Sequence, residues 1–370
     1  MPSTNLHRIE KYLNKSLRIQ TLRGISVLLV VLFHMGFHVF RNGWIGVDIF
    51  FVISGFLMWH LYADQIMNRE ITGFYTKRLK RLLPALSISI LLSALAFMPR
   101  LPASQRASMI DELSAASLGL SNIYYWLIDQ HSSNSELRPL ITLWSISLEL
   151  QFYLLFPIIV FLVKKSTRKL FWLLGFSFIA FLLLGYYSYE TKLYTLPGKL
   201  CEFLLGMLVA SYLHRSEYSK RKFQVADVLL LTFILVSLLV VLNNRNNMIW
   251  QVLTACFSAS YILFGFYDNN TSLLTRFLAK IGDNSYSIYL IHFPLFVYVG
   301  YQEGLGNPIH LNTYSDTIMY VVFLGVGSWA MKKLVEDNRW CSDNYLGILL
   351  TTLVFTVGIV SFKNQIIGLG

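Results

Sequence analysis

Five ionisable side chains interrupt apolar segments of this sequence, at His34, Asp48, Glu149, Glu202 and His292. In hydrocarbon, an ionisable group costs about 2.5–3.5 kcal/mol even on insertion scales, so each such residue needs a partner or a function. A histidine beside carboxylates suits proton transfer, because the imidazole changes its charge close to neutral pH. The same residue types also build the proton relays of transporters.

The first two apolar segments are joined by only a short turn, about Arg41 to Trp44, and must form an antiparallel hairpin. At about 1.5 Å per residue, His34 and Asp48 then differ in depth by one helical turn. A contact between them is feasible. It is either a polar pair that locks the hairpin or a carboxylate that orients an imidazole for proton transfer.

Two further carboxylates, Glu149 and Glu202, are expected at a similar depth in the outer half of the membrane. Ser145 lies four residues before Glu149 and therefore shares its helix face. One such carboxylate is usually structural. A layer that also contains His34 and Asp48 favours a functional site.

A basic cluster precedes the third apolar segment, with Arg78 and Arg81 three residues apart. Such a cluster is commonly a cytoplasmic stop for membrane insertion. Alternatively, two guanidinium groups on one face can clamp phosphate groups.

The elements that position these residues are predicted to be membrane-spanning helices. Of the 370 residues, 55% are hydrophobic and only 14% are charged, which excludes both a set of soluble domains and disorder. With about 20 residues per crossing, we predict an all-α polytopic bundle of about eleven spans. They cover 24–40, 45–63, 82–99, 143–163, 170–187, 198–213, 226–242, 248–266, 284–300, 315–332 and 345–362, and the third helix is expected to begin at Pro84.

Most Lys and Arg residues fall in alternate loops, which places the N-terminus in the cytoplasm and the C-terminus outside. We predict a single membrane domain over 1–370, with a basic N-terminal segment over 1–22 and an outer loop over 100–142. Within that loop, Asp111 to Trp126 is expected to form one interfacial helix. The positive-inside pattern accounts for the net charge of +11 without nucleic acid, and the three cysteines are expected to be unpaired.

In their order along the chain, the motifs resemble those of acyltransferase family 3, membrane proteins that include bacterial O-antigen and exopolysaccharide O-acetylases. Arg23 and His34 match an Arg-x10-His motif, and GVDIFFVISGF around Asp48 matches a Gly-Val-Asp-x-Phe-Phe segment. Arg78 and Arg81 match an Arg-x-x-Arg motif.

Later segments continue the resemblance to acyltransferase family 3. WSISLELQFY resembles a Trp-Ser-Leu-x-x-Glu-Glu-Gln-Phe-Tyr block with Leu150 in place of the second glutamate, and CEFLLG contains Glu202. SYSIYLIH resembles a Ser-Tyr-Ser-x-Tyr-Leu-x-His motif. VEDNRW resembles a Glu-x-Pro-x-Arg signature with Asn338 where proline is usual.

The resemblance implies an enzyme that transfers an acyl group, most simply acetyl, from cytoplasmic acyl-CoA to a hydroxyl of a cell-surface or lipid-linked glycan. His34 is the expected general base or acyl carrier, oriented by Asp48 or Glu149. The expected coenzyme A contacts are Arg23, Arg78 and Arg81, and no metal is expected. Further candidate site residues are Ser147, Glu202, Tyr286 and His292.

The resemblance also implies a multi-pass protein of the bacterial inner membrane, in a stand-alone form without a fused esterase-like domain. The expected partners are the bilayer, a glycan or glycolipid acceptor and polysaccharide assembly machinery. The alternative from another class is a transporter or flippase with an intramembrane proton relay. Its weakness is the lack of an internal sequence repeat.

Overall fold

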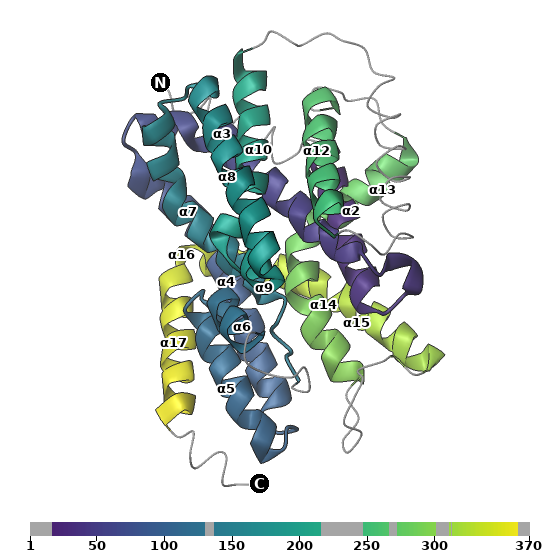
Figure 1. Ribbon diagram of the computed structural model, residues 1–370. Coiled ribbons are helices and arrows are strands. Elements are labelled where there is room, and N and C mark those ends of the chain that lie inside the picture. The colour runs from purple at the N-terminus through teal and green to yellow at the C-terminus, as the bar shows by residue number, and fades with distance from the viewer. Residues whose placement is uncertain are drawn as a thin grey trace. The chain divides into compact units, whose positions relative to one another are not determined.

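The computed structural model describes residues 17–129, 137–215, 247–265, 272–300, 311 and 313–361, and these residues form helices and connecting turns without a strand (Figure 1). Seven helices in this part of the chain are long and apolar enough to cross a membrane. Ser285–Gly300 and Tyr345–Ser361 are shorter apolar helices. The protein is therefore an all-α, multi-pass membrane bundle, as predicted.

Most predicted spans coincide with helices. The agreeing helices are α3 (Gly46–Met67), α7 (Leu143–Val163), α8 (Thr167–Tyr187), α10 (Leu196–Arg215), α12 (Asn247–Gly265), α14 (Ser285–Gly300), α15 (Tyr314–Met331) and α17 (Tyr345–Ser361). The span expected over 226–242 lies outside the described residues. The three cysteines are unpaired, as expected.

The chain divides into two compact units. Unit 1 comprises Met1–Phe74 and Phe152–Ser285, and unit 2 comprises Tyr75–Gln151 and Tyr286–Gly370. His34, Asp48 and Glu202 belong to unit 1, whereas Arg78 and Glu149 belong to unit 2.

The first helix of unit 1, α2 (Leu17–His34), begins and ends earlier than the predicted span of 24–40. It ends because Gly36 has a φ of +77°, in the left-handed region that glycine adopts without steric cost. Two short 3₁₀ turns, His38–Phe40 and Gly43–Ile45, then lead into α3. His34 therefore lies in the last turn of its helix instead of within a longer span.

Helices α3 and α10 form the centre of unit 1 and lie side by side (Figure 1). Two glycines allow this close approach. A Cβ atom on Gly55 would lie 1.9 Å from the carbonyl oxygen of Phe203, and one on Gly206 would lie 2.0 Å from that of Val52. The Phe51 and Phe203 rings pack 4.6 Å apart between the two helices.

Unit 1 also contains α9 (Tyr189–Tyr194), which connects α8 to α10, and α13 (Leu273–Asp283), which packs against α2. The hydropathy pattern did not predict either of these helices. Both are too short to cross a bilayer, so a search for spans passes over them.

In unit 2, α4 (Ile71–Phe97) begins well before Pro84, so the prediction that this helix starts at Pro84 was wrong. Proline removes one backbone hydrogen bond without ending a membrane helix, because neighbouring groups can satisfy the freed carbonyl. Pro294 shows such compensation in α14. The hydroxyl of Ser89 donates to the carbonyl oxygen of Leu290, four residues before that proline, at 3.2 Å.

The described part of the segment predicted to be an outer loop contains two helices, α5 (Ala103–Ser117) and α6 (Ser121–Asp129), where one helix from Asp111 to Trp126 was expected. Gly119, with a φ of +68°, lies between them and causes the break. The Ser147 hydroxyl accepts a hydrogen bond from the backbone N–H of Ser121, the first residue of α6, at 3.1 Å.

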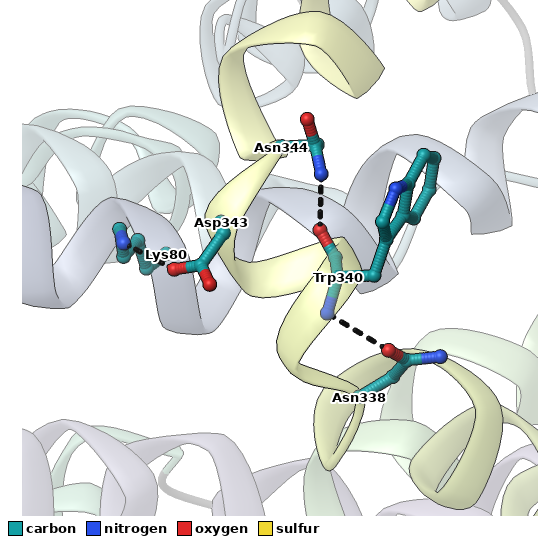
Figure 2. A network of polar contacts seen from close by, with 5 residues as sticks. All are labelled: Lys80, Asn338, Trp340, Asp343 and Asn344. Carbon is teal, nitrogen blue, oxygen red and sulfur yellow. Dashed lines mark hydrogen bonds and ion pairs between the residues drawn. The ribbon is translucent and has the colours of Figure 1, made fainter.

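A surface network in unit 2 organises α16 (Arg339–Asp343), which follows α15 and a π-helical turn over Lys332–Glu336 (Figure 2). Asn338 accepts a hydrogen bond from the Trp340 N–H at 2.9 Å. Asn344 donates to the Trp340 carbonyl at 2.9 Å. The Lys80 ammonium lies 2.7 Å from Asp343 and lowers the pKa of that carboxyl group. Both charges are partly solvated, so this pair adds little stability.

Candidate active site

The best-defined polar feature of unit 1 is a buried ion cluster of Asp48, Lys199 and Glu202. The Lys199 ammonium lies 2.6 Å from Asp48 Oδ1 and 3.2 Å from Glu202 Oε1. The side chains are 0%, 1% and 3% exposed for Lys199, Asp48 and Glu202, respectively. Removing one partner from such a cluster would leave a charge in a low-dielectric interior.

Local sequence explains how the cluster forms. Lys199 and Glu202 are three residues apart near the start of α10, so their side chains share a face. Asp48 lies in the first turn of α3, where the helix dipole favours a negative charge. The glycine-mediated contact of α3 with α10 brings these two helix starts together.

The cluster contains two carboxylates for one ammonium, and Asp48 Oδ2 and Glu202 Oε2 are buried without hydrogen-bond partners among the described residues. A second buried lysine, Lys192 on α9, lies near this negative charge. Its ammonium is 5.2 Å from the Phe181 ring centroid and 5.1 Å from that of Tyr189. Burial, followed by the charge of Lys199, lowers the pKa of Lys192 to about 8.

His34 is half-buried at the end of α2, and its Nδ1 lies 2.9 Å from the carbonyl oxygen of Val30. A carbonyl can only accept, so the neutral ring carries its proton on Nδ1 and its basic lone pair on Nε2. Asp48 makes its hydrogen bond to Lys199 and forms none to His34. The tautomer of the His34 imidazole is thus set by the backbone carbonyl of Val30, whereas the sequence had suggested a carboxylate for this role.

Arg23 lies on α2 with His34, eleven residues earlier, so these two residues are about 16 Å apart along one helix. The Arg23 guanidinium donates to Gln20 Oε1 at 3.3 Å and is half-buried.

Unit 2 contains the remaining predicted residues. Glu149 is half-buried on α7, one turn from Ser145. The Ser145 hydroxyl lies 2.6 Å from the phenol oxygen of Tyr289, which donates to the Thr142 carbonyl at 3.0 Å. This contact joins the WSIS segment of α7 to the SYSIYLIH segment of α14.

The two other candidates on α14 make backbone contacts. Tyr286 donates to the carbonyl oxygen of Leu82 on α4 at 2.9 Å. His292 is completely buried, and its Nδ1 lies 2.7 Å from the Tyr289 carbonyl. Ser147 is also buried, and its hydroxyl accepts from α6 as described above. The contacts of Tyr286 and Ser147 join neighbouring helices, whereas the contact of His292 lies within α14.

The predicted arginine pair lies on one face of α4. Arg78 is only 3% exposed and Arg81 is half-buried, whereas the neighbouring Lys77 is exposed. An arginine that only stops membrane insertion is expected to reach water or headgroups. The burial of Arg78 therefore favours a role inside the protein.

Sequence reasoning missed Lys199, Lys192 and Tyr289 as site residues. Lys199 could have been identified, because it lies three residues before Glu202 within an apolar segment. No sequence pattern indicates Lys192, because its burial depends on the short helix α9 and the aromatic rings around it.

Comparison with known proteins identifies the family. The family model described as an acyltransferase domain, acyltransferase family 3, matches residues 17–361. The chain belongs to this family. The matched range thus includes all the described helices and every predicted site residue.

Two relatives come from Staphylococcus aureus. O-acetyltransferase OatA of strain NCTC 8325 / PS 47 is 28% identical over 321 residues, which cover 76% of this chain and 51% of OatA. SACOL0978 of strain COL is 29% identical over 322 residues, with the same two coverages. The chain thus spans about half the length of these relatives. No solved structure matches it.

Proposed function

We propose that this protein is a membrane O-acyltransferase that moves an acyl group, most simply acetyl, from acyl-CoA to a hydroxyl of a cell-envelope glycan. The observation that carries the proposal is the acyltransferase family match over residues 17–361. The O-acetyltransferase name of the relative OatA supports acetyl as the group and a hydroxyl as the acceptor. The same family match favours an acyltransferase over the transporter alternative.

His34 acts as the general base in this proposal. As the acceptor oxygen attacks the thioester carbonyl carbon, Nε2 takes the hydroxyl proton, the carbon–sulfur bond breaks and the coenzyme A thiolate leaves. The contact of Nδ1 with Val30 supports this role, because it leaves the basic lone pair on Nε2. The open carbonyls at the end of α2 also attract the positive charge that forms on the ring.

Asp48 and Glu149 have different roles in the proposal. Asp48 on α3 forms an ion pair with Lys199 on α10 and so positions the starts of these two helices. Glu202 strengthens this contact through its own ion pair with Lys199. Glu149 remains a candidate for stabilising the imidazolium or the acceptor, because it is half-buried on the helix that carries the family's Trp-Ser motif.

Arg23, Arg78 and Arg81 are the proposed contacts for coenzyme A. Guanidinium groups form charge-assisted hydrogen bonds with phosphates. The burial of Arg78 supports a binding role, because an arginine that only directs membrane topology does not need to be buried. With the N-terminus in the cytoplasm, α4 would present this pair on the side where acyl-CoA is made. We further propose one functional membrane domain, located in a bacterial inner membrane and associated with polysaccharide assembly.

The test is acyl transfer by membranes that contain the His34→Ala variant, with isotopically labelled acetyl-CoA and an envelope glycan fraction. Loss of a general base lowers the rate about 10²- to 10⁴-fold. His38→Ala is the matched control, because His38 is exposed in the following 3₁₀ turn. Transfer by His34→Ala at more than about a tenth of the control rate would remove His34 from the mechanism. A wild-type protein that acylates no glycan hydroxyl would refute the proposed function itself.

A further inference from the structure

An apolar cavity of about 310 Å³ lies within unit 1, between α8, α10 and α12. Its walls are mainly aromatic and aliphatic, and they include Phe171 and Phe178 of α8 and Leu205 of α10. Phe171 is 59% exposed, so the cavity has an edge on the outer surface of the helices. In a bilayer, such an edge would give a membrane molecule lateral access to the cavity.

Two polar side chains line this otherwise apolar space, Glu202 from α10 and Gln251 from α12. Glu202 is 3% exposed and Gln251 is 1% exposed. Glu202 Oε2 and both polar atoms of the Gln251 amide have no hydrogen-bond partner among the described residues. Buried polar atoms are normally paired, so the two unpaired amide atoms of Gln251, next to the Glu202 carboxyl group, indicate a missing partner at this cavity.

The three atoms define the chemistry of that partner. Glu202 Oε2 and Gln251 Oε1 require hydrogen-bond donors, and Gln251 Nε2 requires an acceptor. A hydroxyl or an uncharged amide offers both kinds of group. An anionic headgroup is disfavoured, because the ion cluster at this end of the cavity already has two carboxyl groups for one ammonium.

We infer that the cavity binds a neutral membrane lipid through a hydroxyl or amide headgroup held by Glu202 and Gln251. The upper part of an acyl or isoprenoid chain would occupy the aromatic walls, and the rest of the chain would stay in the bilayer. The volume is at the lower end of the range of ligand cavities, about 300–1,000 Å³. Because Glu202 also binds Lys199, the lipid headgroup would contact the edge of the ion cluster.

Binding can be tested with the full chain in phosphatidylcholine nanodiscs. The probe is a diacylglycerol that carries a photoreactive diazirine near the start of one acyl chain, and cross-linked peptides are identified by mass spectrometry. We expect saturable labelling of α8, α10 or α12 that unlabelled diacylglycerol abolishes. A phosphatidic acid probe with the same chains should label these helices weakly. Equal labelling by the two probes would overturn the neutral headgroup, and no saturable labelling would overturn the site.

Two variants test the cavity and its polar end separately. Gly175 lines the cavity, and a Cβ atom there meets nothing within 4 Å, so Gly175→Leu can fill the space without a backbone clash. Gly325→Leu on α15 is the matched control, because Gly325 is equally open and does not line this cavity. Gly175→Leu should abolish the saturable labelling, and Gly325→Leu should leave it intact.

Gln251→Leu keeps the apolar volume and removes the amide. We expect half-saturation of labelling to require about three- to tenfold more diacylglycerol. Thermal unfolding of each variant shows whether it is folded. Unchanged labelling in folded Gly175→Leu and Gln251→Leu would refute the inference. The measurement does not depend on acyl transfer, so it can fail while the His34 experiment succeeds, or the reverse.

Discussion

Replacing Lys199 with methionine is expected to destabilise the protein strongly. Methionine has a similar length and fills the space between α3 and α10, so the change mainly removes the ammonium. Asp48 and Glu202, at 1% and 3% exposure, would then face each other without a counter-ion. Breaking a buried ion pair by removing one partner costs about 3–5 kcal/mol.

The assay is thermal unfolding of purified protein in detergent, at a fixed heating rate because such unfolding is often irreversible. The matched control is the triple variant Asp48→Asn, Lys199→Met, Glu202→Gln, which has the same methionine and no charge in the cluster. Replacing an entire buried ionic set by neutral groups is often close to neutral in stability. The triple variant should therefore unfold at a clearly higher temperature than Lys199→Met.

A triple variant no more stable than Lys199→Met would refute this account, because the loss would then come from packing and not from charge. The same triple variant also tests the role of Asp48 in acyl transfer. If it is folded and retains transfer, Asp48 positions helices and does not take part in the chemistry.

Three further predictions concern other parts of the two units. Arg78→Lys with Arg81→Lys should raise the KM for acyl-CoA at least about tenfold in a donor titration and leave the acceptor KM unchanged, since lysine cannot form forked phosphate contacts; an unchanged donor KM would mean that the pair only directs topology. The folded-state pKa of Lys192 is about 8, below its ordinary 10.5, so the unfolded chain binds more protons between these values and stability rises with pH there. Lys192→Met should therefore raise the unfolding temperature at about pH 7, with a smaller gain near pH 10, and a gain independent of pH would contradict burial of a charged lysine. Gly55→Ala should lower the yield of folded protein in detergent chromatography, because its Cβ would lie 1.9 Å from the Phe203 carbonyl, while Gly175→Ala should be tolerated.

The spans could be predicted because membrane insertion depends on the summed apolarity of about 20 consecutive residues, which is a local property of the sequence. Helix boundaries were less predictable. Gly36 and Gly119 end or break helices through a left-handed backbone, while Pro84 lies inside α4 without ending it. Whether a glycine or proline interrupts a helix depends on which neighbouring groups compensate for the lost hydrogen bonds.

The sequence alone predicted that Asp48 and Glu202 lie at similar depth. The short hairpin turn places Asp48 near the start of its helix, and counting along the predicted helix 198–213 places Glu202 near the start of that one. Only the tertiary structure decided which side chains meet. The rotation of α10 against α3, made possible by Gly55 and Gly206, directs Asp48 to Lys199. Depth follows from counting residues along one helix, whereas partner choice follows from the packing of helices far apart in the chain. For this reason the sequence could indicate that a contact between His34 and Asp48 was feasible, although the two side chains form no hydrogen bond.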